Sequence, residues 1–483
     1  MGLPNPSFLR RVSSAVRQLF YSKEGIFSTP INVCSKFIVV FIIFGAFLER
    51  TGIAEYFIQI ANTIVGSFSG GPAKVAVVAS ALMGIVSGSS VANTVGSGSV
   101  TIPLMKKTGY KSEFAAATEA AASTGGQIMP PIMGAAAFLM AEYVQEPYSK
   151  IVLRAILPAV LYFTGIFISV HLEAKKLGLK GLSKDEMPKW ADLGKKIYLL
   201  APLVLLVWLV SSGAKTMQFS AAVSILAAVI VGFLNKDERL TFKKIFEALE
   251  AGAKGAITVA VACAIAGMIA GCITVTGLAS ILINAIVQLA GSATFIGLIL
   301  TMVCCIVLGM GVPTTANYCI MASTCAPILI KMGFPLVAAH FFVFYFGIVA
   351  DITPPVALAA YAGSAIAKGN PMKTGINATK LAIAAFIVPY IFAYSPAMLF
   401  VNVTSVWEVI QIVLSALLGI FGVAAGLEGF VLRKMNWLYR IVYLVGGLGL
   451  MIPGAISDLV GLVLIGGVFV IQYLQNKKER EIA

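Results

Sequence analysis

Apolar residues along this chain gather in runs long enough to cross a membrane, and short polar segments separate these runs. A transmembrane helix needs about 20 predominantly apolar residues. Windows that meet or approach this length lie at residues 31–48, 53–66, 73–90, 112–144, 151–171, 197–212, 217–234, 255–275, 278–290, 294–310, 335–367, 377–401, 406–426 and 438–473. The pattern predicts an all-α polytopic membrane protein with about 12 to 15 passes.

Composition and charge support this fold class. Of the 483 residues, 59% are hydrophobic and 12% are charged, whereas about 25% of the residues in a soluble domain are charged. The formal net charge is +14, but the basic residues lie in short runs beside apolar windows, as they do in the cytoplasmic loops of membrane proteins. We therefore expect no nucleic-acid partner.

Two basic loops orient the middle of the chain. Residues 173–196 carry seven lysines, Lys184 among them, and residues 235–254 carry four lysines and one arginine. Two apolar windows separate the loops, so two crossings return the chain to one face, and the positive-inside rule makes that face cytoplasmic. Residues 1–30 alternate basic and apolar side chains, which is typical of a helix on an anionic membrane surface.

An internal repeat is evident when each residue is compared with the residue 224 positions later. Asn93 matches Asn317 (317 − 93 = 224), and Pro130-Pro131 matches Pro354-Pro355 in the same register without a gap. Over residues 92–141, 13 of 50 positions are identical, which exceeds the chance level for membrane sequence rich in alanine and glycine. We conclude that the chain contains two copies of one unit.

Each copy contains two polar breaks within apolar sequence. Small and hydroxyl-bearing residues with an asparagine form the first break, at residues 84–94 and 309–317, and a Pro-Pro pair marks the second, at residues 123–131 and 347–355. Proline removes a backbone donor and frees carbonyl groups, which at membrane depth must face protein or a polar cavity. Matching broken segments in two halves indicate the binding site of a secondary transporter.

One acidic residue lies inside these breaks. Asp351 stands in the second copy where the first copy has Gln127. A carboxylate at membrane depth is costly and is functional by default, and together with hydroxyl, amide and carbonyl oxygens it would suit a sodium ion. A proton carried by Asp351 is the alternative. Nothing in the sequence indicates an organic cofactor, and Glu119, which also lies in apolar sequence, receives no role.

Several of these segments resemble a known family. Residues 86–93, 102–110 and 122–137, together with residues 309–317 and 350–359 of the second copy, are similar to the large membrane subunit of TRAP (tripartite ATP-independent periplasmic) transporters. The likeness is closest to the fused permease of the TAXI branch and covers residues 25–400. It implies an elevator-type transporter of the inner membrane, in which two inverted repeats each contribute a re-entrant hairpin and a broken helix.

The resemblance also implies an activity and a site. Sodium-coupled uptake of an organic anion such as a carboxylate is expected, with no enzymatic activity, and the hairpins map to residues 87–106 and 313–331. Carried over by motif, the sodium-binding positions are Ser89, Ser90, Asn93, Gly125, Thr314, Asn317 and Asp351. Substrate contacts are expected from residues in or beside the same breaks, namely Ser87, Thr94, Gln127, Pro130, Thr315 and Pro354.

The resemblance names partners as well. A periplasmic solute-binding protein would deliver the substrate. Fused permeases carry small-subunit helices ahead of the large-subunit region, and here only a short basic segment precedes it. We expect a separately supplied small membrane subunit, the alternative being that the true start of the protein lies upstream. Anionic lipids are the remaining expected partner.

The predicted organisation has five segments: a surface segment at 1–30, a first repeat at 31–171, basic loops with a helical hairpin at 172–254, a second repeat at 255–400 and a C-terminal transmembrane extension at 401–483. Two alternatives stay open. A sodium- or proton-coupled carboxylate carrier that works without a binding protein would share the repeat, and a membrane scaffold without transport activity would share the helices.

Overall fold

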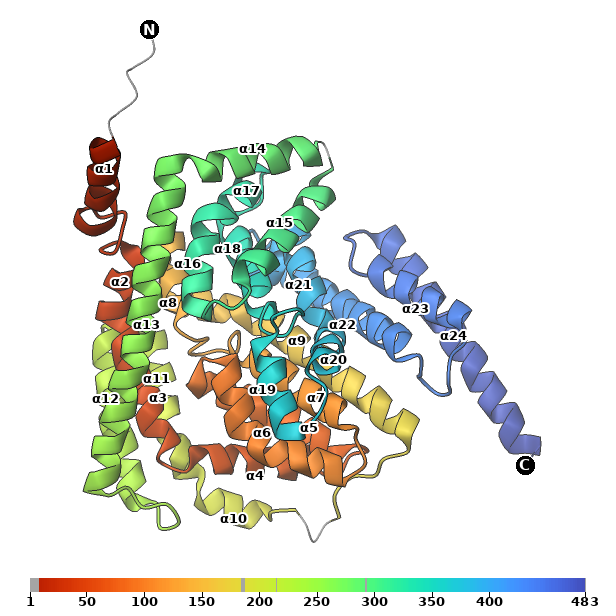
Figure 1. Ribbon diagram of the computed structural model, residues 1–483. Helices are drawn as coiled ribbons and strands as arrows, with labels where there is room; N and C mark the ends of the chain where they lie inside the picture. Colours follow the sequence, from red (N-terminus) through yellow and green to blue (C-terminus); the bar gives the residue numbers. More distant parts are fainter. Residues whose placement is uncertain (1–7, 184–186, 214, 292, 483) are drawn as a thin grey trace. The chain divides into compact units, whose positions relative to one another are not determined.

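The computed structural model describes residues 8–183, 187–213, 215–291 and 293–482. Across these ranges the chain is helical and forms no β-strand (Figure 1). Lys184 of the first basic loop lies outside the described residues. The predicted all-α polytopic fold class is confirmed, because seven described helices are long and apolar enough to cross a membrane: Thr29–Glu49, Tyr148–Leu177, Met217–Leu234, Phe242–Thr276, Pro371–Tyr394, Val406–Glu428 and Ala455–Glu479.

The described helices divide into two compact units, and each unit contains parts of both sequence repeats. The first-hairpin unit comprises Gly52–Gly134, Lys150–Leu200 and Ile348–Ala483. The second-hairpin unit comprises Met1–Thr51, Ala135–Ser149 and Ala201–Gly347. Each name refers to the hairpin that the unit contains.

In the first-hairpin unit, helices from distant parts of the sequence pack around α7. Helices α5 and α6 pack on each other and on α7, and α19 and α20 also pack against α7 (Figure 1). Ala115, Ala117 and Ala121 of α7 are fully buried, and such small side chains let neighbouring helices approach closely. The α-helices of this unit are α4 (Ile53–Val65), α5 (Gly71–Ser87), α6 (Ser90–Lys107), α7 (Ser112–Gly126), α9 (Tyr148–Leu177), α10 (Trp190–Lys195), α19 (Leu358–Ala367), α20 (Pro371–Leu381), α21 (Ile383–Tyr394), α22 (Val406–Glu428), α23 (Trp437–Gly449) and α24 (Ala455–Ile482). The first two residues of α9 belong to the other unit.

In the second-hairpin unit, the long helix α13 packs against α3 and α16, and α8 packs against α16 (Figure 1). The interior of α18 is aromatic, with Phe341, Phe342, Phe344 and Phe346 buried. The helices are α1 (Phe8–Tyr21), α2 (Thr29–Val33), α3 (Val39–Glu49), α8 (Ala136–Val144), α11 (Ala201–Ser212), α12 (Met217–Leu234), α13 (Phe242–Thr276), α14 (Leu278–Ala290), α15 (Thr294–Gly309), α16 (Thr314–Thr324), α17 (Ala326–Lys331) and α18 (Leu336–Val349), whose last two residues belong to the other unit.

The register of the sequence repeat is also the register of the helices. Helix α6 begins at Ser90 and ends at Lys107, and 224 residues later Thr314 begins α16 and Lys331 ends α17. In the same register α5 corresponds to α15 and α7 to α18. The two copies therefore repeat a helical arrangement as well as a set of motifs.

The first described residues form the amphipathic helix that the sequence predicts. Helix α1 exposes Val12, Val16 and Phe20. Its contact with a membrane surface stays a prediction, as does the division of the chain into five segments.

Candidate functional site

The first hairpin turns at Gly88, between the end of α5 at Ser87 and the start of α6 at Ser90. Gly88 has φ +60° and a Cβ there would lie 2.9 Å from Gly134 Cα, so both the turn and the close backbone approach require glycine. Ser89 is the N-cap of α6, and its Oγ accepts a hydrogen bond from the Ala92 N–H at 3.4 Å. Ser89 therefore has a structural role at the tip.

The hairpin packs closely on the end of α7. A Cβ on Gly84 would lie 2.1 Å from Gly126 Cα, so only two glycines allow these helices to approach to this distance. Asn93 lies at the same contact, and its Nδ2 donates to the Ser80 carbonyl at 3.1 Å. The amide of Asn93 therefore ties α6 to α5.

Asp351 reaches the first hairpin from the break after α18. Its Oδ2 accepts a hydrogen bond from Ser90 Oγ at 2.5 Å and lies 3.4 Å from Gln127 Nε2. The Asp351 side chain is buried, with 8% of the residue exposed. Gln127 and Asp351 are counterparts in the repeat (351 − 127 = 224), so the two broken segments meet at this carboxylate.

Several buried oxygens of the first hairpin and of the break at Gln127 have no hydrogen-bond partner among the described residues. They are Ser87 Oγ at the tip, Thr94 Oγ1 in α6 and Gln127 Oε1. Buried polar atoms are normally hydrogen-bonded, and an unpaired group calls for an explanation such as an ion or a ligand. Hydroxyl, amide and carboxylate oxygens are also the donor set that a hard cation prefers, so these residues fit a sodium ion.

The other predicted residues of this unit have packing roles in the structure. A Cβ on Gly125 would lie 2.1 Å from Tyr162 Cε1, so its lack of a side chain makes room for the tyrosine. The bonds Pro130-Pro131 and Pro354-Pro355 are both cis, and both breaks are partly exposed. A Cβ on Gly375 would lie 2.9 Å from Pro354 Cγ. Neither proline donates a backbone hydrogen bond.

Three predicted residues lie in the second-hairpin unit. Thr314 and Thr315 open α16, and Asn317 Nδ2 donates to the Gly347 carbonyl at 2.9 Å while its Oδ1 has no hydrogen-bond partner. Asn317 thus ties two helices together as its counterpart Asn93 does. The structure joins Ser90, Gln127 and Asp351 by contact and places ten of the predicted residues in the first-hairpin unit: Ser87, Ser89, Ser90, Asn93, Thr94, Gly125, Gln127, Pro130, Asp351 and Pro354.

The sequence assigned no role to Glu119, which the structure places at the centre of a buried hydroxyl cluster. The usable signal was spacing, because Ser97 and Thr101 of α6, and Glu119 and Ser123 of α7, are each four residues apart and therefore share a helix face.

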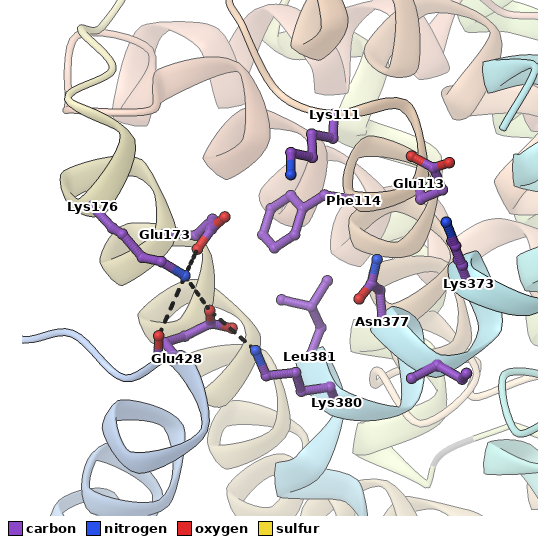
Figure 2. Close-up of a pocket in the computed structure, with 11 residues that line it drawn as sticks. Lys111, Glu113, Phe114, Glu173, Lys176, Lys373, Asn377, Lys380, Leu381 and Glu428 are labelled. Carbon is purple, nitrogen blue, oxygen red and sulfur yellow. Dashed lines mark hydrogen bonds and ion pairs between the residues drawn. The ribbon is translucent and has the colours of Figure 1, made fainter. Parts of the chain in front are cut away.

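A separate polar cavity of about 370 Å³ also lies in the first-hairpin unit (Figure 2). Figure 2 shows Lys176 and Lys380 directed at the Glu428 carboxylate, with N–O distances of 3.9 and 3.3 Å. No residue of the predicted site lines this cavity, whose lining is Lys111, Glu113, Phe114, Glu173, Lys176, Lys373, Ile376, Asn377, Lys380, Leu381 and Glu428.

A helical membrane protein with paired breaks around a buried carboxylate belongs to the broad class of secondary transporters, and comparison with known proteins specifies the family. The family model described as tripartite ATP-independent periplasmic transporter, DctM component, matches residues 11–407. The chain belongs to this family. It is a large membrane subunit of a TRAP transporter and a multi-pass protein of the inner membrane, as its motifs predict; the assignment to the TAXI branch stays a prediction.

Curated relatives agree with the family. The C4-dicarboxylate TRAP transporter large permease protein DctM of Pseudomonas aeruginosa is 26% identical over 402 residues, which cover 80% of this chain and 92% of that protein. The 2,3-diketo-L-gulonate TRAP transporter large permease protein YiaN of Escherichia coli is 24% identical, over 73% of this chain and 83% of that protein. The isethionate TRAP transporter permease protein DctMQ of Oleidesulfovibrio alaskensis is 24% identical, over 74% of this chain and 56% of that protein.

Proposed function

We propose that this chain couples sodium entry to the uptake of an organic anion, and that Asp351 is a sodium ligand. The observation that carries the proposal is the meeting of Asp351 with Ser90 and Gln127, so that one carboxylate joins the hairpin tip to both broken segments. A buried carboxylate of this kind in a membrane protein is costly unless it binds a cation or a proton.

Neutral oxygens of the first hairpin and of Gln127 suit sodium. Gln127 Oε1 is buried without a partner, and so are the hydroxyl oxygens of Ser87 and Thr94. The neutral oxygens of these residues would complete the coordination that the carboxylate begins, while the ion would neutralise the carboxylate. Binding of the ion would therefore fix the tip of the first hairpin relative to the break that carries Asp351.

An organic acid is the best supported substrate class. The relatives carry the names of C4-dicarboxylate, 2,3-diketo-L-gulonate and isethionate transporters, and all three compounds are organic anions. Helices α6 and α16 begin at the hairpin tips, where unpaired N–H groups and the helix dipole favour a negatively charged group. The substrate anion would bind at a hairpin tip, and an elevator movement of inverted repeats would carry it across the membrane.

The proposed assembly includes other proteins. A periplasmic solute-binding protein would deliver the anion and a small membrane subunit would accompany this chain, in keeping with the family and with the fused relative DctMQ.

Anionic lipids would contact the basic segments. The cavity of Figure 2 supports this part of the proposal. Lys111 and Lys373 in its lining form no ion pair within the part of the chain that the structure describes, and basic pockets between membrane helices suit lipid phosphates.

Thermal unfolding of the purified protein tests the sodium site without a known substrate. Sodium chloride should raise the midpoint relative to potassium chloride at equal ionic strength, by on the order of 2 °C, because a ligand of the folded state stabilises it. Asp351→Asn should remove the difference. Asp192→Asn is the matched control, since Asp192 lies in α10 with 61% of its side chain exposed.

The outcome separates the proposal from its alternatives. A sodium effect that survives in Asp351→Asn would contradict the role of Asp351 and would favour a proton on that carboxyl. Wild-type protein with no preference for sodium over potassium would contradict sodium coupling and favour the proton-coupled carrier.

A further inference from the structure

A second buried carboxyl group lies apart from Asp351. Glu119 is in the middle of α7 and is 0% exposed. Its carboxyl group lies within hydrogen-bonding distance of hydroxyl groups on three helices, which are Ser80 of α5, Ser97 and Thr101 of α6, and Ser123 of α7. The proposed sodium site gives this group no role.

The four hydroxyls are divided unequally between the two carboxyl oxygens. Oε1 faces three of them: Ser80 Oγ at 2.5 Å, Ser123 Oγ at 3.1 Å and Ser97 Oγ in a short contact. Oε2 faces Thr101 Oγ1 alone. An ionised carboxylate has two equivalent acceptors, whereas a carboxylic acid has one acceptor oxygen and one O–H donor. The unequal division fits the acid.

Thr101 can accept the proton that the acid would donate. Its Oγ1 also lies 3.1 Å from the Ser97 carbonyl oxygen. If Oε2–H donates to Thr101 Oγ1, the single hydroxyl proton of Thr101 is free to bond that carbonyl, and both contacts of Thr101 are satisfied. Complete satisfaction is what a buried polar cluster requires.

No positive charge faces Glu119. Among the residues that the structure describes, no lysine, arginine or histidine forms an ion pair with it, and the side chains that interact with it from α5, α6 and α7 are the four hydroxyls. Two basic groups on these helices have other partners, since Lys74 Nζ of α5 lies 2.9 Å from His171 Nδ1 and Lys106 Nζ of α6 donates to the Ala367 carbonyl at 2.6 Å. An unpaired buried carboxylate would be costly.

The fold itself does not require this carboxyl. The position 224 residues after Glu119 is Val343, which is fully buried in α18. The counterparts of the four hydroxyl residues are apolar, sulfur-containing or lack a side chain: Cys304, Met321, Cys325 and Gly347. The same helical arrangement is therefore built at this place without a polar cluster, so Glu119 is retained for something other than packing.

We propose that Glu119 is a proton-binding site, a neutral carboxylic acid that positions the first hairpin for cation binding. The link to the site runs through Asn93: Ser97 Oγ lies 2.7 Å from the Asn93 carbonyl, and the Ser80 carbonyl accepts the Asn93 amide at 3.1 Å. Glu119 thus contacts Ser80 and Ser97, the two residues that contact Asn93, and Asn93 lies one helical turn from Ser90.

Infrared spectroscopy of the purified protein tests the protonation state directly. At neutral pH the wild type should show a carboxylic-acid C=O band that is absent from Glu119→Gln. The band should persist in Glu113→Gln, a control on the same helix. The proposal would be overturned if the wild type and Glu119→Gln had the same carboxylic-acid band and the variant had lost carboxylate absorption instead.

Sodium-dependent unfolding tests the positioning role, and this arm rests on the proposed function. The sodium midpoint is the sodium concentration that gives half of the maximal stabilisation against thermal unfolding. Gln at position 119 retains an acceptor oxygen for the three serines and an N–H donor for Thr101, so Glu119→Gln should keep the sodium midpoint within about twofold of wild type. Glu119→Ala should raise it about tenfold or more, because the hairpin loses its anchor.

The infrared experiment and the sodium experiment can contradict their hypotheses independently of each other. A folded Glu119→Gln protein that loses its response to sodium would show that the negative charge is needed, which contradicts a neutral acid. Loss of the sodium response in the wild type would refute the proposed function, and the infrared band would still decide whether Glu119 holds a proton.

Discussion

The hairpin helices α5 and α6 correspond in the repeat to α15, α16 and α17, yet the two hairpins have different interiors. In the first-hairpin unit, the buried carboxyls of Glu119 and Asp351 accept hydrogen bonds from hydroxyl groups. In the second-hairpin unit, Cys304 Sγ lies 3.7 Å from Cys325 Sγ, and Tyr318 Oη lies 2.8 Å from His340 Nδ1.

This difference separates what the fold needs from what the function needs. Both copies keep the asparagine that ties two helices, at Asn93 and Asn317, so we infer that this bond belongs to the architecture. Neither carboxyl is repeated: Glu119 of the first copy corresponds to Val343, and Asp351 of the second copy corresponds to Gln127. Residues that break the symmetry of a repeat are therefore the first candidates for ion chemistry.

The largest effect should follow from making the first hairpin resemble the second. Glu119→Val introduces the residue found at position 343 and removes four hydrogen bonds. We expect the free energy of unfolding to fall by about 3 kcal/mol, since hydrogen bonds within membrane proteins contribute about 0.6 kcal/mol each and the serines left without an acceptor add to the loss. Titration with a denaturing detergent would measure the free energy of unfolding. A smaller decrease in Glu119→Val than in Val343→Ala would argue against a distinct polar cluster.

The shared asparagines should behave alike. Asn93→Ala and Asn317→Ala each remove a buried bond to a backbone carbonyl and leave a small cavity. Each should lower the free energy of unfolding by about 2 kcal/mol. If the same titration gave very different values for the two variants, the asparagines would not share one architectural role.

Ser90→Ala should weaken sodium binding more than it weakens the fold. The variant removes the hydroxyl that lies 2.5 Å from Asp351 Oδ2. We expect about a tenfold loss of sodium affinity, equal to about 1.4 kcal/mol. The shift of the sodium midpoint in thermal unfolding would measure this loss. An unchanged midpoint would place Ser90 outside the cation site.

The smallest effect is expected in the second-hairpin unit. Tyr318→Phe removes the hydroxyl that meets His340 and leaves the aromatic packing in place. The free energy of unfolding should fall by about 0.6 kcal/mol, with no change in the sodium midpoint. A change in the sodium midpoint would mean that the aromatic interior of this hairpin also serves ion binding.

Much of the fold could be predicted from the sequence because membrane helices have a simple physical signature. Apolar windows gave the all-α class, and the 224-residue repeat indicated which segments correspond; the structure shows that the register extends to the first residues of α6 and α16. The windows could not show that each compact unit combines helices of both repeats, since packing between distant segments has no local signal.

The site was only partly accessible to sequence reasoning. Asp351 stood out because a carboxylate in apolar sequence is rare and costly. Its contacts with Ser90 and Gln127, which lie 261 and 224 residues away, depend on tertiary structure. Glu119 was noticed without a role because its four hydroxyl partners come from three helices, and hydroxyls in membrane helices more often bond their own backbone.

Direct measurement of sodium binding tests the central claim most plainly. Purified wild type and Asp351→Asn would be compared by binding of radioactive ²²Na⁺, with Asp192→Asn as the control and potassium as the competitor. We expect sodium binding that potassium does not displace in the wild type and the control, and about a 100-fold loss of affinity in Asp351→Asn, because a buried charge loses its partner. Equal binding of ²²Na⁺ by wild type and Asp351→Asn would contradict it.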